Sequence, residues 1–309
     1  MKNFAFVDKE SNCRILFDQN GPYWHIATPG NLSEILFITP DDYRYGVTLS
    51  ALCALETGLD VYAFQLMSNH IHEIVGAASP DQCVENLRLF AKRFKRYATS
   101  QGRHLDLSSF VCEPLPILSL QSLRNNIVYN HRNKYVVDSS QTPYSSPWGS
   151  GILYFGPDIG QLQSVKFKDL PYREQRSLTN SRRKTFPENY TVRDGYITPE
   201  SFCSWKTGRA FFRDAHQYFN MLTKNFEAYA EFSALLEDSS CLTDEEMFSA
   251  ACAIAKQQFN TDLPSRLSDA GKREVARKLH FDFRAGNNQI RRILNLSTVV
   301  LESMFPTAR

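Results

Sequence analysis

The sequence has no long hydrophobic run and no segment that reads as a leader. No stretch approaches the roughly 18 to 20 apolar residues that a membrane helix needs, so we expect no membrane partner. The first residues, MKNFAFVDKESNC, carry charges where a signal peptide has its apolar segment. These two absences predict a cytoplasmic protein.

Paired cysteines and strong net charge are also missing. The seven cysteines stand singly without a CxxC pair, so neither a zinc knuckle nor a disulfide framework is indicated. The net charge is only +2, which means that nucleic-acid binding would have to depend on local basic clusters. The whole sequence is 42% hydrophobic and 22% charged, the composition of an ordinary globular protein.

Basic residues gather at two places in the chain. One cluster consists of Lys92, Arg93, Lys95 and Arg96. The other consists of Arg182, Arg183 and Lys184. Both clusters are candidates for contacts with the phosphates of DNA, and each can equally be a solvated face of the protein.

Strand and helix patterns alternate in the first half of the chain. β-rich runs predict strands at 24–28, 61–66 and 71–75, with weaker candidates at 36–38 and 151–155. Apolar periodicity predicts helices at 41–56, 79–98 and 118–135. The order β, α, β, β, α is typical of a split βαβ unit. We therefore predict an α+β domain with a ferredoxin-like antiparallel sheet over residues 1–160.

The second half of the chain reads as a connector followed by helices. Prolines interrupt residues 161–199, which also hold the second basic cluster, and this predicts an irregular basic connector. Helical periodicity over 200–309 predicts an all-α C-terminal domain. Its end, about 270–305, resembles a helix-turn-helix in which Ser297 caps the last helix. The residues at its expected core positions are Ala276, Leu279, Ile290, Leu294, Val299 and Leu301.

The last helix of this motif lacks the Arg, Lys, Asn or Gln side chains that read base edges. Arg291 and Arg292 on the preceding helix remain candidates for phosphate contacts. The alternative is a domain that supports the rest of the protein or mediates self-association, so a homodimer is a further expectation.

Two histidines flank an apolar residue in the third predicted strand. Side chains alternate along a strand, so His70 and His72 share one face while Glu73 lies on the other. A metal ion between the two imidazoles would need a ligand from another element. In the helix over 118–135, Tyr129 and Asn133 are spaced i to i+4 and project from one helix face. Placed over the sheet, they would put a phenol beside the metal.

Three segments together resemble a known family. They are Leu66-Met67-Ser68-Asn69-His70-Ile71-His72, Ile127-Val128-Tyr129-Asn130-His131-Arg132-Asn133 and Pro147-Trp148-Gly149-Ser150. They are similar to the "MPNHxH", "IxYxxRN" and "PWSS" or "PWGS" motifs of the HUH single-strand endonucleases of the single-tyrosine class, specifically the REP-associated tyrosine transposases. The segments stand in the family's order over about half of the chain. Ser68 departs from the family, which usually has proline there.

The resemblance implies a DNA transesterase. Tyr129 would be the nucleophile that forms a 5′-phosphotyrosine, and His70, His72 and Asn133 would hold Mg²⁺ or Mn²⁺. The implied substrate is single-stranded or hairpin DNA, on which Tyr97 and Trp148 are candidates for stacking unpaired bases.

Two other interpretations stay open. Sliding the helix motif by three residues pairs Asn130 with the family's asparagine and leaves Asn126 in place of the tyrosine. The protein would then be a catalytically silent DNA-binding or regulatory protein of the same fold. The third interpretation is a small-molecule metal hydrolase, which would need further histidines near the metal, and no ligand spacing in the sequence indicates them.

Overall fold

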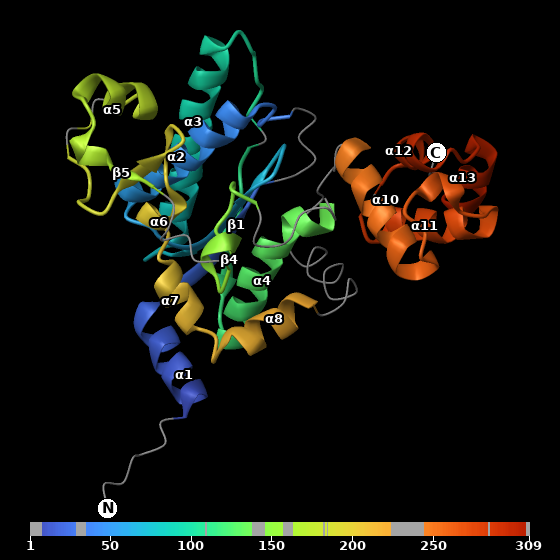
Figure 1. The fold of residues 1–309 in the computed structure, drawn as a ribbon, viewed down its shortest axis with the longest axis horizontal. Coiled ribbons are helices and arrows are strands. Elements are labelled where there is room, and N and C mark those ends of the chain that lie inside the picture. The colour runs from blue at the N-terminus through green and yellow to red at the C-terminus, as the bar shows by residue number, and fades with distance from the viewer. Residues whose placement is uncertain are drawn as a thin grey trace, which may run out of the picture.

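The computed structural model describes residues 8–28, 35–108, 110–137, 146–156, 163–181, 183, 185–223, 244–283 and 285–306. For residues 133–137, 223, 244–246, 249 and 288 it describes the backbone alone. A sheet flanked by helices forms one part of the molecule, and helices α10 to α13 gather beside it (Figure 1). None of the described helices is both long and apolar enough to cross a lipid bilayer.

A four-stranded antiparallel sheet forms the centre of the fold. Its elements follow the order β1 (Tyr23–Ala27), α2 (Pro40–Thr57), β2 (Asp60–Leu66), β3 (Ile71–Gly76), α3 (Pro80–Ser100) and β4 (Leu115–Ile117). The strands lie in the order β2-β3-β1-β4, and each neighbouring pair is antiparallel. The prediction of an α+β fold with an antiparallel sheet is therefore confirmed. Strand β4 was not among the predicted strands.

Local signals define helix α2 at both ends. Thr39 and Asp42 form a capping box, in which each side chain accepts a hydrogen bond from the other residue's backbone. Pro40 occupies the first turn, where its missing amide costs nothing. The helix ends at Gly58, which adopts the left-handed conformation with φ of 70°. The sequence therefore marks both ends of this helix locally.

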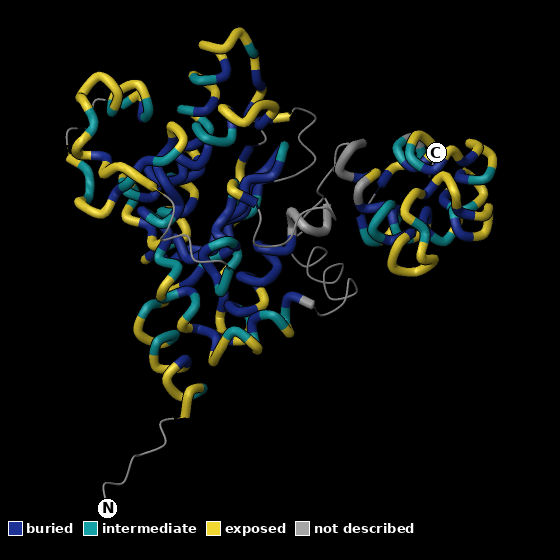
Figure 2. The backbone as a smooth tube through the Cα atoms, viewed as in Figure 1, coloured by how far each residue is buried: buried dark blue, intermediate teal, exposed yellow. Residues whose placement is uncertain are grey.

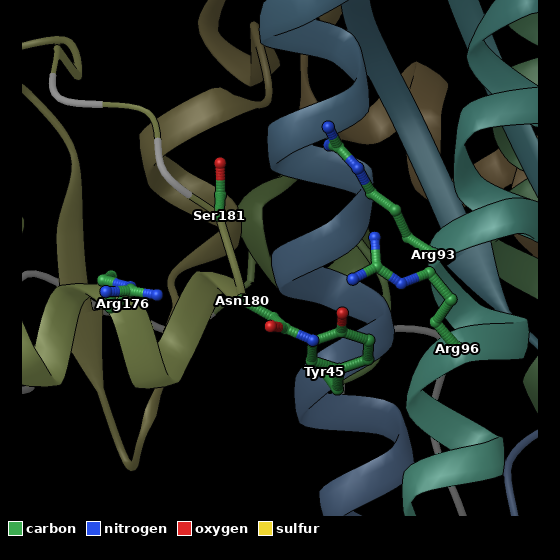
Figure 3. Close-up of a pocket in the computed structure, with 6 residues that line it drawn as sticks. All are labelled: Tyr45, Arg93, Arg96, Arg176, Asn180 and Ser181. Atoms are coloured by element: carbon green, nitrogen blue, oxygen red, sulfur yellow. The ribbon is translucent and has the colours of Figure 1, made fainter.

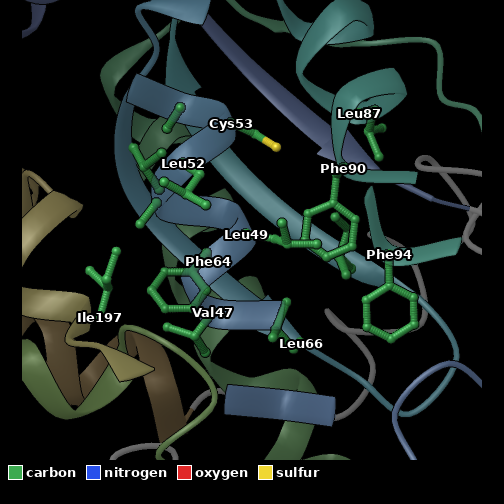
Figure 4. Close-up of a cluster of buried hydrophobic side chains, with 14 of the residues drawn as sticks. Val47, Leu49, Leu52, Cys53, Phe64, Leu66, Leu87, Phe90, Phe94 and Ile197 are labelled. Carbon is green, nitrogen blue, oxygen red and sulfur yellow. The ribbon is translucent and has the colours of Figure 1, made fainter. Parts of the chain in front are cut away.

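Helices cover both faces of the sheet. Helices α2 and α3 pack on one face, where the core includes Phe64 and Leu66 of β2 and Phe90 and Phe94 of α3 (Figure 4). Helix α4 (Leu120–Val137) packs on the other face against β2 and β3. Helix α1 (Lys9–Asn20), which the sequence analysis did not predict, lies along α4. The sheet is consequently buried on both sides (Figure 2).

The outer edge of β2 is covered by two loops. Leu66 donates its amide to the carbonyl of Trp148, and Ser150 donates its amide to the carbonyl of Phe64. A Cβ on Gly149 would lie 2.2 Å from the Oε1 atom of Gln65 and 3.0 Å from the carbonyl oxygen of Phe64, so a larger residue would have to displace Gln65. Further along the same edge, Ser204 donates to the carbonyl of Val61. The Pro-Trp-Gly-Ser segment thus closes an edge of the sheet.

The segment predicted to be an irregular connector contains regular structure. It forms a small antiparallel sheet of β5 (Val165–Lys166), β6 (Thr191–Arg193) and β7 (Tyr196–Ile197), with the short helices η3 (Phe167–Asp169) and α5 (Tyr172–Thr179) between β5 and β6. Both β7 and α5 pack against α2. The prediction of an irregular segment was wrong because these elements are too short to produce a periodic pattern.

Helices make up the remaining described part of the chain. They are α6 (Pro199–Phe202), α7 (Trp205–Ala210), α8 (Ala215–Thr223), α10 (Asp244–Phe259), η4 (Pro264–Arg266), α11 (Asp269–Phe281), α12 (Asn287–Leu294) and α13 (Thr298–Met304). Ser297 caps α13 as expected, by accepting from the amide of Val300. Val299 is 76% exposed, so its expected core position was wrong, whereas Leu301 is buried.

The two weaker strand predictions were also wrong. Residues 36–38 form no strand, because the amides of Leu36 and Phe37 both donate to the carbonyl of Ser68. Residues 151–155 begin with a single turn of 3-10 helix, η1 (Gly151–Leu153). In both cases a short apolar run marks buried loop residues, which periodicity cannot distinguish from a strand.

Candidate functional site

The alternation of strand β3 places His72 on the face of the sheet that α4 covers. Its neighbour Ile74 packs in the same cluster as Leu123 and Ile127 of α4. Glu73 points to the opposite face, where Asn86 of α3 donates to its carboxylate at 3.0 Å. The expectation that Glu73 lies away from the two imidazoles is thereby confirmed.

His70 comes directly before β3 and lies beside His72. The centroids of the two rings are 4.9 Å apart, and both residues are buried, with 1% and 0% of their surface exposed. Two imidazoles that bind one cation at about 2.1 Å have their centroids about 5 Å apart. The spacing of the two rings therefore fits a shared cation.

A chain of hydrogen bonds assigns the tautomer of His72. The amide nitrogen of Asn126 donates to the carbonyl of Ser122 at 2.8 Å, so the Oδ1 atom of Asn126 faces Nδ1 of His25, 2.7 Å away. An amide oxygen only accepts, so in the neutral ring of His25 the proton is on Nδ1. Its Nε2 then accepts from Nδ1 of His72 at 3.2 Å. This leaves the lone pair of His72 on Nε2.

His70 also contacts an amide oxygen. Its Nδ1 lies 2.7 Å from the side-chain oxygen of Asn69 and therefore carries the proton. The lone pair of His70 is on Nε2, as in His72. Both rings thus have the protonation pattern of metal-binding histidines, in which the second nitrogen donates to a neighbouring group. These residues fit a divalent cation.

Sequence reasoning missed His25. Strand β1 pairs with β3 so that Ala27 is opposite His72 and His25 is opposite Ile74. His25 and His72 are therefore diagonal neighbours on one face of the sheet. Alternation along β1 alone predicts which face of the sheet His25 lies on. It does not predict which residue of another strand lies beside it, because that depends on the pairing of β1 with β3. His25 orients His72 through Nδ1 of that ring.

Three side chains of helix α4, those of Asn126, Tyr129 and Asn130, lie close to the histidines. The ring centroid of Tyr129 is 5.7 Å from that of His72 and 6.1 Å from that of His25. Asn126 contacts His25 as described above, and Asn130 donates to the backbone carbonyl of His72 at 3.1 Å. Residues 126, 129 and 130 share one face because they are three and four positions apart. The expected proximity of Tyr129 to the histidines is therefore present.

The ring of Tyr129 is almost completely covered. It is 4% exposed and packs in one cluster with Met67 and with residues of α10 that include Met247 and Ile254. The C-terminal helices thus meet the sheet domain at this tyrosine, where α10 contacts α4.

The third expected metal ligand, Asn133, has no described side chain. Its backbone lies in α4, one turn after Tyr129. The described residues contain no group of three or more His, Cys, Asp or Glu side chains placed to hold an ion. His25 does not complete such a group, because its Nε2 faces His72.

His131 belongs to the core and not to this site. It is fully buried, and its two nitrogens lie 2.9 Å from the hydroxyls of Tyr218 and Ser150. Burial lowers the pKa of His131 to about 3, so the ring is neutral at physiological pH. It links α4 to α8 and to the loop on the edge of β2.

The first basic cluster lies on the other side of the sheet from these histidines, because it belongs to α3. Lys92, Lys95 and Arg96 are exposed, whereas Arg93 forms an ion pair with Glu56 at 2.7 Å. Tyr97 stacks on Tyr45, with ring centroids 4.1 Å apart.

The remaining DNA-binding candidates are dispersed. Trp148 is half-buried and stacks on Tyr43 at 5.2 Å, a packing role for at least one face of its ring. Arg183 donates to the carbonyl of Thr185. Arg182 and Lys184 lie outside the described residues. Arg291 and Arg292 are exposed on α12.

Comparisons with known proteins identify no relative. No family model matches the chain, and neither a curated protein nor a solved structure matches it.

Proposed function

We propose that this protein cuts and rejoins single-stranded DNA by forming a covalent phosphotyrosine at Tyr129. The observation that carries the proposal is the position of this phenol. Its ring lies 5.7 Å from the ring of His72, on the face of the sheet that also carries His70. A nucleophile, two imidazoles with their lone pairs on Nε2 and a polar helix face thus meet at one place.

The topology of the sheet supports this proposal. The element order β1, α2, β2, β3, α3, β4 with strand order β2-β3-β1-β4 is that of a ferredoxin-like sheet. The paired histidines lie at the start of a central strand, and the tyrosine lies on helix α4, which comes after β4. This is the arrangement expected for an HUH domain of the single-tyrosine class.

The chemistry exchanges one phosphodiester for another. The phenolic oxygen of Tyr129 attacks the phosphorus, an O–P bond forms to the tyrosine, and the bond from phosphorus to the 3′ oxygen breaks. The proton that the phenol loses is balanced by the proton that the leaving 3′ oxygen takes up. The products are a 5′-phosphotyrosine and a 3′-hydroxyl, and the reverse reaction rejoins the strand without a nucleotide triphosphate.

A divalent cation would assist a nucleophile that is weak at neutral pH, since the pKa of a free tyrosine is about 10. His70 and His72 would hold Mg²⁺ or Mn²⁺ through Nε2, with Asn133 as the expected third ligand. When bound, the ion would stabilise the negative charge that develops on the scissile phosphate. His25 and Asn69 would keep the two imidazoles in the required tautomer and orientation.

The burial of Tyr129 adds a condition. A DNA strand cannot reach a side chain that is 4% exposed, so α10 has to separate from Met67 and Tyr129 before attack. The conformation that cleaves DNA would thus be one in which Tyr129 is more exposed than in this structure.

Covalent trapping tests the proposal. The full-length protein is incubated with Mn²⁺ and a pool of 3′-labelled hairpin oligonucleotides with randomised single-stranded flanks, because the fragment joined to tyrosine keeps the 3′ end. The expected result is a labelled band of protein size that survives denaturing electrophoresis. Tyr129→Phe should abolish this band.

The matched controls are changes at exposed positions. Tyr172→Phe on α5 and His216→Ala on α8 alter the same residue types away from the site and should retain the adduct. The proposal is wrong if wild type and Tyr129→Phe behave alike. Binding of the hairpins by both proteins without any adduct would establish the catalytically silent DNA-binding protein instead.

A further inference from the structure

A second polar site lies on the other side of the sheet. Helices α2, α3 and α5 enclose a pocket of about 430 Å³, a size typical of ligand sites (Figure 3). It is lined by Tyr45, Arg93, Arg96, Arg176, Asn180 and Ser181. Two arginines come from α3 and one from α5, so guanidinium groups approach the pocket from both sides.

The positive charge in this pocket is largely uncompensated. Arg93 is paired with Glu56. Within the part of the chain that the structure describes, neither Arg96 nor Arg176 forms an ion pair, and no carboxylate lines the pocket. The pocket therefore presents two available guanidinium groups, whose flat fork of N–H donors matches the oxygens of a phosphate.

The other lining groups can complete an anion site. Burial raises the pKa of Tyr45, so its phenol keeps its proton at neutral pH and can donate a hydrogen bond. The side chain of Asn180 reaches toward Tyr45 (Figure 3). The carboxyl end of α5 also meets the pocket and brings a partial negative charge. Attraction for an anion must therefore come from the arginines and not from the helix dipole.

The pocket is held by packing and is not a chance gap between side chains. Asn180 ends α5 in the left-handed conformation and donates its amide to the carbonyl of Arg176 at 2.8 Å. Thr179 of α5 is buried. On the opposite wall, Tyr45 is fixed by its stack on Tyr97. Both sides of the pocket are thus held by contacts within the protein.

We propose that this pocket binds a backbone phosphate of a nucleic-acid strand. A strand is favoured over a small phosphate ester because the positive charge continues beyond the pocket. Lys92 is exposed one helical turn before Arg96 on α3, so a second phosphate would meet a second cation. The anion site stands on the geometry alone, and only the choice of a nucleic acid as its source rests on the proposed function.

Equilibrium binding to a fluorescent hairpin oligonucleotide with single-stranded flanks, in EDTA, tests the site apart from catalysis. The double variant Arg96→Ala/Arg176→Ala should weaken binding by at least about tenfold. It should also reduce the slope of log K against log salt by about 0.7 for each lost contact to a single strand. Arg266→Ala/Arg273→Ala removes the same charge from exposed positions of the C-terminal helices and should leave the affinity within about twofold.

A second arm uses inorganic phosphate as the probe. Phosphate should raise the melting temperature of the wild type more than chloride does at equal ionic strength, and the pocket variant should lose this difference. If only this arm depends on the pocket, a small phosphorylated ligand replaces the strand and the proposal is overturned. It is equally overturned if the pocket variant matches wild type in both arms.

Failure of the catalytic proposal would look different. Tyr129→Phe should keep the full pocket-dependent affinity for the hairpin even though it forms no adduct. If wild type also forms no adduct while Arg96→Ala/Arg176→Ala still weakens binding, the phosphate site survives and the nuclease does not.

Discussion

The two faces of strand β3 carry polar side chains in opposite surroundings. On the α4 face, His72 lies among hydrogen-bonding groups of His25, Asn126 and Asn130. On the α2 and α3 face, Glu73 is fully buried in an apolar layer, where Asn86 donates to it. Burial raises the pKa of Glu73 to about 7, partly offset by Ser50 and Asn86. One face of the strand thus carries hydrogen-bonded imidazoles, and the other carries a carboxyl group whose charged form is disfavoured by burial.

The largest difference between the two faces should appear in catalysis. His72→Ala removes one of the two imidazoles that would hold the cation, so the rate of adduct formation should fall by at least about 10²-fold. Glu73→Gln, one residue away on the other face, should leave that rate within about twofold. Single-turnover trapping with Mn²⁺ measures both variants. Equal losses in the two would mean that the faces are not functionally distinct.

The second difference concerns stability against pH. The pKa of Glu73 is raised from 4.5 to about 7 in the folded protein. The folded protein therefore has its full stability below about pH 4.5, where Glu73 is protonated in both states, and it loses stability as the pH rises through 7. At about 1.36 kcal/mol per pKa unit, the loss amounts to about 3 kcal/mol. Glu73→Gln cannot ionise, so it should be more stable than wild type by about this amount at pH 8.5 and similar to it at pH 4.5.

Urea unfolding at the two pH values measures this difference. Glu113→Gln, at an exposed position, is the control and should follow wild type at both. A constant gap between Glu73→Gln and wild type across the pH range would contradict the buried titration.

The smallest expected effect concerns His25, which contacts His72 rather than the cation. His25→Ala should weaken Mn²⁺ affinity by about 10 to 100-fold, the loss typical when a group that orients a metal ligand is removed. Titration followed by electron paramagnetic resonance of free Mn²⁺ reads this directly, without DNA. His25→Asn, which can still accept from Nδ1 of His72, should recover part of the affinity. Unchanged affinity in His25→Ala would limit His25 to packing.

The contrast between the faces was predictable from β3 itself. Alternation in His70-Ile71-His72-Glu73 places the carboxylate opposite the imidazoles, and the helical spacing places Tyr129 on a single face of α4. Both predictions depend only on spacing within a single strand or helix. The capped helix α2 and the strand limits of β2 and β3 were predictable for the same reason.

Relations between distant segments were not predictable. His25 lies 47 positions before His72, and their contact follows from the pairing of β1 with β3. The pocket between α3 and α5 likewise brings Arg96 near Arg176 through the packing of α5 on α2. The prediction that Val299 is buried was also wrong, because helical periodicity alone was compatible with either a buried or an exposed position. Each of these features depends on which strands and helices pack together, and residue spacing within one element does not determine this packing.

The closed edges of the sheet bear on how two copies of this chain can associate. At one end, the loop of Trp148 and Gly149 already occupies hydrogen-bonding groups of β2. At the other, β4 is three residues long and its middle residue, Pro116, has no amide to donate. Strand addition across a two-fold axis is therefore disfavoured at both edges of the four-stranded sheet, which points a homodimer toward other surfaces of the described residues.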